Sequence, residues 1–218
     1  MKWTTQKYYN KPTTALKELP IPLKPGSVDP YFTDEIGNVS TSRYRPNDIR
    51  DASLDIQPRY PVFGGWKYSF RIGWNNNLSD FLRKLGGENV HILRVPFIEG
   101  PKIKEGVFYE HAQIRIILPE GAENVRWNLV GGVGVPDCTY EISRHKTFMD
   151  TTGRTALTLN ARSLIDEARE ISLVVRYDYS FSAAFRKPLS IFVGTFVIFL
   201  TAWLVGQVDI SIGPKKTV

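Results

Sequence analysis

Hydrophobic side chains take every second position from residue 66 to residue 74, where the alternating residues are Trp66, Tyr68, Phe70, Ile72 and Trp74. Successive side chains of a β-strand point to opposite faces, so this alternation predicts a strand with an aromatic stripe along one face. Such a stripe must be covered by other parts of the chain. The pattern therefore predicts a strand that packs into a hydrophobic core.

Four later segments also have strand character, and turn residues such as those at 119–121 separate them. These segments are residues 90–97, 112–118, 125–130 and 171–179. Residues 78–85 carry apolar side chains at helical spacing before a Gly-Gly stop, and residues 163–170 are a second helix candidate. The sequence thus predicts a mainly β fold: an antiparallel, sandwich-like domain with short helices.

The segment from Leu189 to Val208 contains no charged residue. About 20 residues at roughly 1.5 Å each match the roughly 30 Å hydrocarbon core of a bilayer, so this segment predicts one transmembrane α-helix. A buried core helix is the alternative. Basic pairs at residues 186–187 and 215–216 flank the segment and suit contact with lipid headgroups. Because the two pairs nearly cancel, they leave the orientation of the helix open.

Prolines mark the N-terminal part of the chain. Five of them fall within residues 11–30, which predicts an extended connector, and residues 31–57 remain rich in loop residues. We therefore expect four regions. They are a connector and loop region at residues 1–57, the β domain at 58–187, the membrane helix at 188–208 and a short tail at 209–218.

Charge and cysteine content argue against a nucleic-acid partner and an intramolecular disulfide. The 218 residues carry a formal net charge of +6, but Lys and Arg alternate with Asp and Glu along most of the chain. We therefore expect no nucleic-acid partner. Cys138 is the sole cysteine, so an intramolecular disulfide is excluded and we expect this side chain to be a small buried hydrophobe.

Catalytic, metal-binding and cofactor-binding patterns are not evident in the sequence. His91, His111 and His145 have no Cys or His partner at the spacing of a zinc site. The glycine-rich run at residues 131–136 lacks the third glycine and the following helix of a dinucleotide loop, so a flexible turn is expected. We expect no cofactor, no metal and no catalytic residue, which disfavours a membrane-anchored enzyme acting alone.

Two triplets match the N-x-S/T sequon for N-glycosylation, and they begin at Asn38 and Asn77. Asn38 lies among turn residues, where a glycosylating enzyme can reach it if the region is lumenal. Asn77 directly precedes the first predicted helix, so capping of that helix is the simpler interpretation of its side chain. Asn38 is therefore the stronger candidate for glycosylation.

The N-terminal residues 1–11 contain no apolar segment of a signal peptide. Taken alone, this pattern favours a tail-anchored scaffold protein whose large N-terminal part faces the cytosol. A fragment of a longer secretory precursor would place the same part in the lumen. The two interpretations predict opposite topologies.

Several separated motifs resemble the ribophorin I family, the first subunit of the oligosaccharyltransferase complex of the endoplasmic reticulum. They are DEIGNVSTS at residues 34–42, PRYPVFGGWK at 58–67, ILPEGA at 117–122, YEISR at 140–144 and DTTGR at 150–154. The likeness covers most of the chain in order and extends into the predicted membrane helix. It matches only the second half of the family's lumenal region, and the tail after the helix is short, as in fungal members.

The resemblance implies a single-pass protein of the endoplasmic reticulum membrane with a lumenal β domain. It implies a noncatalytic accessory subunit of the complex that transfers a preassembled glycan from dolichyl pyrophosphate to Asn in N-x-S/T sequons of nascent proteins. The implied partners are other subunits, including the polytopic catalytic subunit, the lipid bilayer and the nascent polypeptide. The match around residues 37–41 also supports a glycan on Asn38.

Overall fold

The computed structural model describes residues 6–9, 15–47, 49–86, 89–103, 106–132, 134–148 and 150–207. Within these residues the chain forms thirteen β-strands, two short 3-10 helices and one α-helix. The strands make four sheets in which every pairing is antiparallel. This confirms the predicted fold class of a mainly β, antiparallel protein with one apolar C-terminal helix.

The first unit contains two three-stranded sheets that share one hydrophobic core. One sheet has the order β1 (Gln6–Tyr9), β6 (Lys67–Asn75) and β3 (Val28–Asp34). The other has the order β2 (Leu19–Leu23), β5 (Ala52–Ile56) and β4 (Arg43–Arg45). The predicted boundary at residue 57 therefore runs through this unit.

The aromatic stripe predicted for residues 66–74 lies on β6 and faces the first core. Tyr68, Phe70, Ile72 and Trp74 are all buried. Trp66 departs from the pattern, because it precedes the strand and is 50% exposed.

The extended connector predicted for residues 11–30 is wrong at residues 19–23 and 28–30, which belong to β2 and β3. Strand β2 tolerates its prolines because, within the described residues, it is an edge strand whose one partner is β5. Pro20 and Pro22 are exposed and alternate with buried Leu and Ile side chains. The Pro20 carbonyl accepts a hydrogen bond from Lys102 N, which enters from outside the sheet.

The second unit is a sandwich of two further sheets. One has the order β10 (Glu123–Val130), β13 (Ser172–Asp178), β8 (Val90–Pro96) and β7 (Leu82–Lys84). The other has the order β11 (Cys138–His145), β12 (Arg154–Leu164) and β9 (Tyr109–Glu120). Its core lies between the sheets, and the fully buried side chains at its centre include Phe97, Leu157, Leu159, Leu173 and Val175.

The first short helix predicted from the sequence is wrong. Residues 78–85 form the 3-10 helix η1 (Leu78–Asp80) and then β7, which pairs with β8. The Phe81 carbonyl accepts a hydrogen bond from Arg94 N, so a neighbouring strand satisfies the backbone that a helix would have satisfied internally. The second candidate is confirmed in part: η2 (Asp166–Glu170) is a 3-10 helix, and residues 163–164 complete β12.

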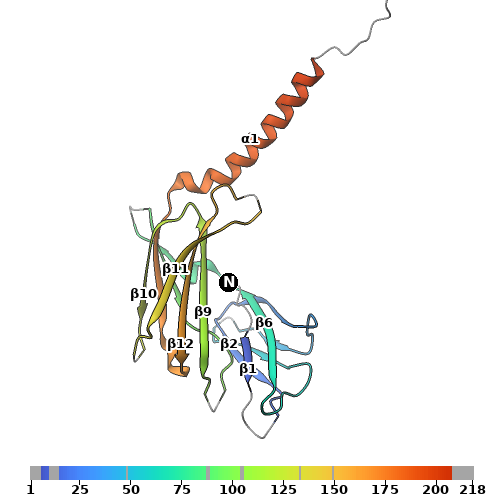
Figure 1. Ribbon diagram of the computed structural model, residues 1–218, viewed down its shortest axis with the longest axis vertical. Coiled ribbons are helices and arrows are strands. Elements are labelled where there is room, and N and C mark those ends of the chain that lie inside the picture. The colour runs from blue at the N-terminus through green and yellow to red at the C-terminus, as the bar shows by residue number, and fades with distance from the viewer. Residues whose placement is uncertain are drawn as a thin grey trace, which may run out of the picture.

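The C-terminal helix α1 (Phe181–Gly206) has 26 residues and begins eight residues before Leu189, where the sequence predicted its start. At about 1.5 Å per residue it extends roughly 39 Å, and it is long and apolar enough to cross a membrane. The ribbon changes direction after the first turns (Figure 1), and Pro188 lies inside the helix. A proline removes one helical hydrogen bond, which accounts for the bend. The predicted end at Val208 lies outside the described residues.

A connection between β8 and β9 joins the two units. We call residues 97–103 the strap. Its Lys102 N donates to Pro20 O of the first unit at 2.8 Å, and Ile103 packs against the first core. The strap therefore brings the segment that follows β8 of the second unit back onto the first unit, which lies away from α1 (Figure 1).

Candidate functional site

The first turn of α1 packs directly on the turn between β9 and β10. Gly121 in that turn has a φ of +87°, and a Cβ added there would lie 2.7 Å from the Cβ of Ala183. Ala183 is only 4% exposed. The Ser180 side chain caps the helix by accepting a hydrogen bond from Ala183 N at 3.3 Å. The membrane helix therefore starts in contact with the sandwich.

A buried carboxylate holds the same part of α1 from a second direction. Asp150, in the loop between β11 and β12, has a fully buried side chain. Its oxygens accept a hydrogen bond from Lys187 Nζ at 2.8 Å and lie 3.3 Å from Arg154 Nε. Hydrogen bonding to Lys187, followed by that to Thr147, holds the pKa of Asp150 well below its usual range. This carboxylate is therefore ionised and compensated at neutral pH.

Glu120, at the end of β9, orders the other side of the same loop. Its Oε1 accepts hydrogen bonds from Thr151 N and Oγ1 at 2.8 and 2.7 Å, and from Thr152 N and Oγ1 at 2.7 and 3.1 Å. These bonds, led by the Thr151 side chain, lower the pKa of Glu120 to about 2. We call Glu120, Gly121, Asp150, Arg154, Ala183 and Lys187 the membrane-proximal junction.

Three sequence segments that are far apart thus meet at the membrane-proximal junction. Two of them, residues 117–122 and 150–154, are among the motifs that carry the family resemblance. The sequence alone assigned Lys187 to lipid headgroups, whereas its ammonium group binds Asp150. No local pattern signals this contact, because the two residues are 37 positions apart.

Two other resemblance motifs meet in the first unit. Arg59 Nε donates to Asp34 Oδ2 at 2.8 Å and its Nη2 donates to Asp34 Oδ1 at 3.2 Å. The Arg59 hydrogen bond is the largest cause of the lowered pKa of Asp34, about 2. Asp34 Oδ1 also accepts from Ile36 N and Gly37 N, which closes the turn that leads to Asn38.

The two sequon asparagines occupy different local structures. Asn38 is exposed just after this turn, and its backbone carbonyl accepts a hydrogen bond from Arg59 Nη2 at 3.4 Å. Asn77 is also exposed, and its Oδ1 accepts from Ser79 N at 3.3 Å, which makes Asn77 the cap of η1. The capping role expected for Asn77 is therefore present, although the helix it caps is a single 3-10 turn.

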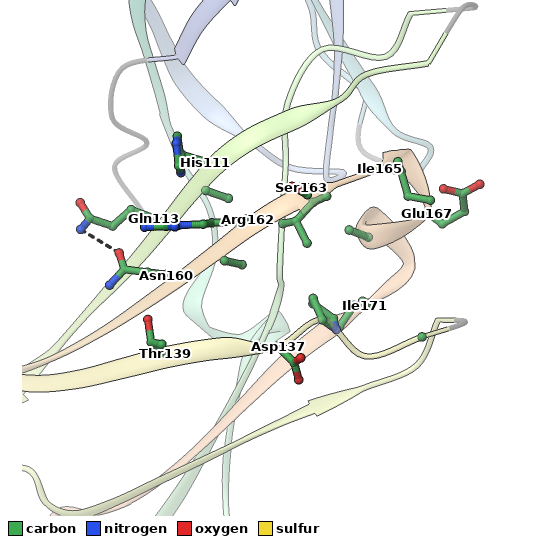
Figure 2. Close-up of a pocket in the computed structure, with 16 residues that line it drawn as sticks. His111, Gln113, Asp137, Thr139, Asn160, Arg162, Ser163, Ile165, Glu167 and Ile171 are labelled. Atoms are coloured by element: carbon green, nitrogen blue, oxygen red, sulfur yellow. Dashed lines mark hydrogen bonds between the residues drawn. The ribbon is translucent and has the colours of Figure 1, made fainter.

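An open hollow of about 1110 Å³ lies at the end of the second unit where β9 begins and β12 ends. Figure 2 shows the polar side chains that line it, among them His111, Asn160, Arg162 and Ser163. Gln113 Nε2 donates to Asn160 Oδ1 at 3.0 Å. Neither His111 nor Ser163 makes a side-chain hydrogen bond to another described residue. The two therefore do not form a hydrogen-bonded pair of nucleophile and base in the described part of the hollow.

The other two histidines contact different parts of the second unit. His91 stacks on Tyr177 with ring centroids 5.6 Å apart, and His145 lies near Arg115, with 3.5 Å between Nδ1 and Nη2. Within the described parts of the chain, no three His, Cys, Asp or Glu side chains gather as metal ligands would. Cys138 is half-buried against the second core.

The sequence is similar to one protein family and to several of its members. A family model described as Ribophorin I matches residues 1–206. Subunit 1 of the dolichyl-diphosphooligosaccharide–protein glycosyltransferase of Schizosaccharomyces pombe is 32% identical over 184 residues, which are 84% of this chain and 39% of that protein. Subunit 1A of Arabidopsis thaliana is 30% identical over 204 residues, 93% of this chain and 31% of the relative.

Subunit 1 of the same glycosyltransferase from Caenorhabditis elegans is 30% identical over 205 residues, which are 91% of this chain and 32% of the relative. The chain therefore spans between 31% and 39% of the length of these three relatives.

Proposed function

The chain belongs to the ribophorin I family, and from that premise we propose that it is a noncatalytic accessory subunit of the oligosaccharyltransferase complex. That complex transfers a preassembled glycan from dolichyl pyrophosphate to Asn in N-x-S/T sequons of nascent proteins. The bond-making groups belong to a polytopic partner subunit. One observation carries the proposal: the family match runs from residue 1 through both β units to the end of α1.

The role that we propose is structural. The membrane-proximal junction fastens the second unit to α1 through the Asp150–Lys187 hydrogen bond and the contact of Gly121 with Ala183. The strap in turn fastens the first unit to the second. A subunit built in this way holds its β units at a set height above the bilayer, where they can contact partner subunits and present acceptor polypeptide.

The proposed topology puts both β units in the lumen of the endoplasmic reticulum. Asn38 is then a glycosylation site, because it is exposed after an ordered turn and both the Asn and the Ser of its sequon are accessible. Asn77 is the weaker candidate, since its side chain caps η1.

Affinity capture of the tagged full chain from microsomes in mild detergent tests the proposal. We expect the polytopic catalytic subunit to copurify, and an unrelated single-pass protein of the same membrane, carrying the same tag, to capture none of it. Capture of the chain without the catalytic subunit would contradict membership in the complex.

Glycosylation and protease protection test the topology separately. We expect an endoglycosidase to remove one glycan from the wild type, and Asn38→Gln to abolish this mass shift while Asn77→Gln leaves it unchanged. Protease added to intact microsomes should leave the β units undigested. Digestion of the β units together with a bare Asn38 would favour a cytosol-facing, tail-anchored scaffold instead.

A further inference from the structure

Large aromatic side chains are exposed at the end of the second unit that carries α1. Phe148 in the loop between β11 and β12 is 88% exposed, and Phe181 and Phe185 in the first turns of α1 are 78% and 51% exposed. The rings of Phe181 and Phe185 are in edge contact, with centroids 4.8 Å apart. Exposed phenylalanines of this kind indicate an interaction surface.

The loop that carries Phe148 is tied to the point where α1 enters its apolar segment. Asp150 Oδ1 accepts a hydrogen bond from Lys187 Nζ at 2.8 Å, and Lys187 directly precedes Pro188. Phe148 is two residues from Asp150, so their Cα atoms are at most about 7 Å apart. Phe148 therefore lies close to the level at which α1 enters a bilayer.

The length of α1 leaves its first turns outside the hydrocarbon. Its 26 residues extend about 39 Å, whereas the hydrocarbon core of a bilayer measures about 30 Å. The uncharged part begins after Lys187, so residues 181–187 remain for the headgroup layer. The ribbon of α1 bends after its first turns (Figure 1), so these turns run at a different angle from the rest of the helix, which contains Pro188.

The charges around these aromatic rings suit phospholipid headgroups. Lys146 and Arg186 are exposed, and neither forms an ion pair with another described residue. The acidic group of the loop, Asp150, is buried and compensated by Lys187 and Arg154. Segments that lie at a membrane interface combine Lys and Arg, which reach the headgroups, with apolar side chains such as Phe, which enter the boundary between headgroups and acyl chains.

We propose that Phe148 and Lys146, together with Phe181, Phe185 and Arg186 in the first turns of α1, form a second membrane contact that inserts into the headgroup layer. Phe148 and Lys146 lie on the loop between β11 and β12, so they add a point outside the helix axis and fix the tilt and rotation of the second unit on the bilayer. The inference depends on α1 crossing a membrane and is independent of the proposed subunit role.

Spin labels on the full chain in phospholipid nanodiscs test this contact. Labels are attached at Phe148→Cys, at Phe181→Cys and at the control Ile49→Cys, each in a Cys138→Ser background. Ile49 is 89% exposed and lies between β4 and β5 of the first unit. That unit lies away from α1 (Figure 1). Power saturation compares accessibility to oxygen, which concentrates in lipid, with accessibility to a water-soluble nickel chelate.

We expect the depth parameter to be positive at positions 148 and 181 and negative at position 49. A label at position 148 with the nickel accessibility of position 49 would overturn the proposal, whatever position 181 shows. Low accessibility of position 148 to both reagents would also overturn it, because the loop would then pack against protein. Circular dichroism and thermal unfolding of each labelled chain show whether its fold is retained.

Discussion

The pKa values of two carboxyl groups, the buried Glu120 and the half-buried Glu99, shift in opposite directions. Glu120 has its pKa lowered from 4.5 to about 2 by hydrogen bonds from Thr151 and Thr152. It therefore contributes stability above pH 4.5 that is lost as the pH falls toward 2. Glu99 in the strap has its pKa raised from 4.5 to about 7 by desolvation, which the charge of Lys24 opposes. The folded chain binds a proton at Glu99 more tightly than the unfolded chain does.

The sign of the Glu99 shift gives a testable pH dependence. Because the folded pKa is the higher one, this residue lowers the free energy of unfolding as the pH rises from 4.5 toward 7. We expect Glu99→Gln to stabilise the chain at pH 8 relative to the wild type, by about 1–3 kcal/mol, and to have little effect at pH 4.5. Thermal unfolding in nanodiscs at several pH values measures the difference. Glu110→Gln, an exposed glutamate on β9, is the matched control.

Parallel pH profiles of Glu99→Gln and the wild type would contradict this account. They would mean that Glu99 remains ionised in the folded chain, with its charge compensated by Lys24 or by a group of the strap.

At the scale of elements, the contact between α1 and the β9–β10 turn has a direct test. Gly121→Ala is destabilising for two reasons. The backbone φ is +87°, and the new Cβ would lie 2.7 Å from Ala183 Cβ. Gly134→Ala is a matched control in the same unit, with a φ of +78° and open space around its Cβ position. We expect Gly121→Ala to lower the free energy of unfolding by about 1–3 kcal/mol more than the control does. Chemical unfolding in nanodiscs measures both.

A second substitution isolates the contact itself. Ala183→Gly removes the methyl group that the new Cβ would meet, so we expect it to recover part of the stability lost in Gly121→Ala. Additive effects of the two substitutions would contradict direct packing of the turn against the helix.

The sequence predicted strands in which several hydrophobic residues alternate or follow one another without interruption, and it missed other strands for different reasons. Strand β6 was found because its buried aromatic side chains alternate with polar ones. Strand β11 was missed because it is an edge strand whose residues are mostly exposed on both faces. Strand β2 was missed because prolines break the usual strand pattern, although an edge strand tolerates them.

Contacts between residues that are far apart in the sequence could not be predicted from it. Asp150 and Lys187 are 37 positions apart, and the strap carbonyl of Gly100 is 69 positions from Arg169. Such contacts follow from the packing of the sheets and not from a local period. The exposed sequon asparagines, in contrast, are local features, so the sequence alone could propose them.

At the scale of the whole molecule, the Arg169 side chain adds polar contacts between the strap and the second unit to the burial of Phe97 and Ile98. Arg169 in η2 donates from Nη1 to Gly100 O at 2.9 Å and from Nη2 to the Pro101 carbonyl. Its Nη2 also donates to Tyr109 OH at 3.0 Å, and its Nε lies 2.5 Å from Asp166 Oδ1. The guanidinium therefore bridges the strap, η2 and the start of β9. The same strap reaches the first unit through Lys102 and Ile103.

Arg169→Lys should loosen the arrangement of the two units without unfolding either of them. A lysine keeps the positive charge beside Asp166 but lacks the planar fork that reaches two carbonyls and a hydroxyl at once. Pulsed electron spin resonance between labels at Ile49→Cys and Glu110→Cys, in a Cys138→Ser background, reports the distance between the units. We expect the distance distribution to broaden in Arg169→Lys and to stay narrow in the control Arg162→Lys, an exposed arginine on β12. If the Arg169 hydrogen bonds hold the units in place, losing them must give the units more freedom. An unchanged width would therefore contradict this role and mean that Lys102, Ile103 and the other strap contacts hold the units without Arg169.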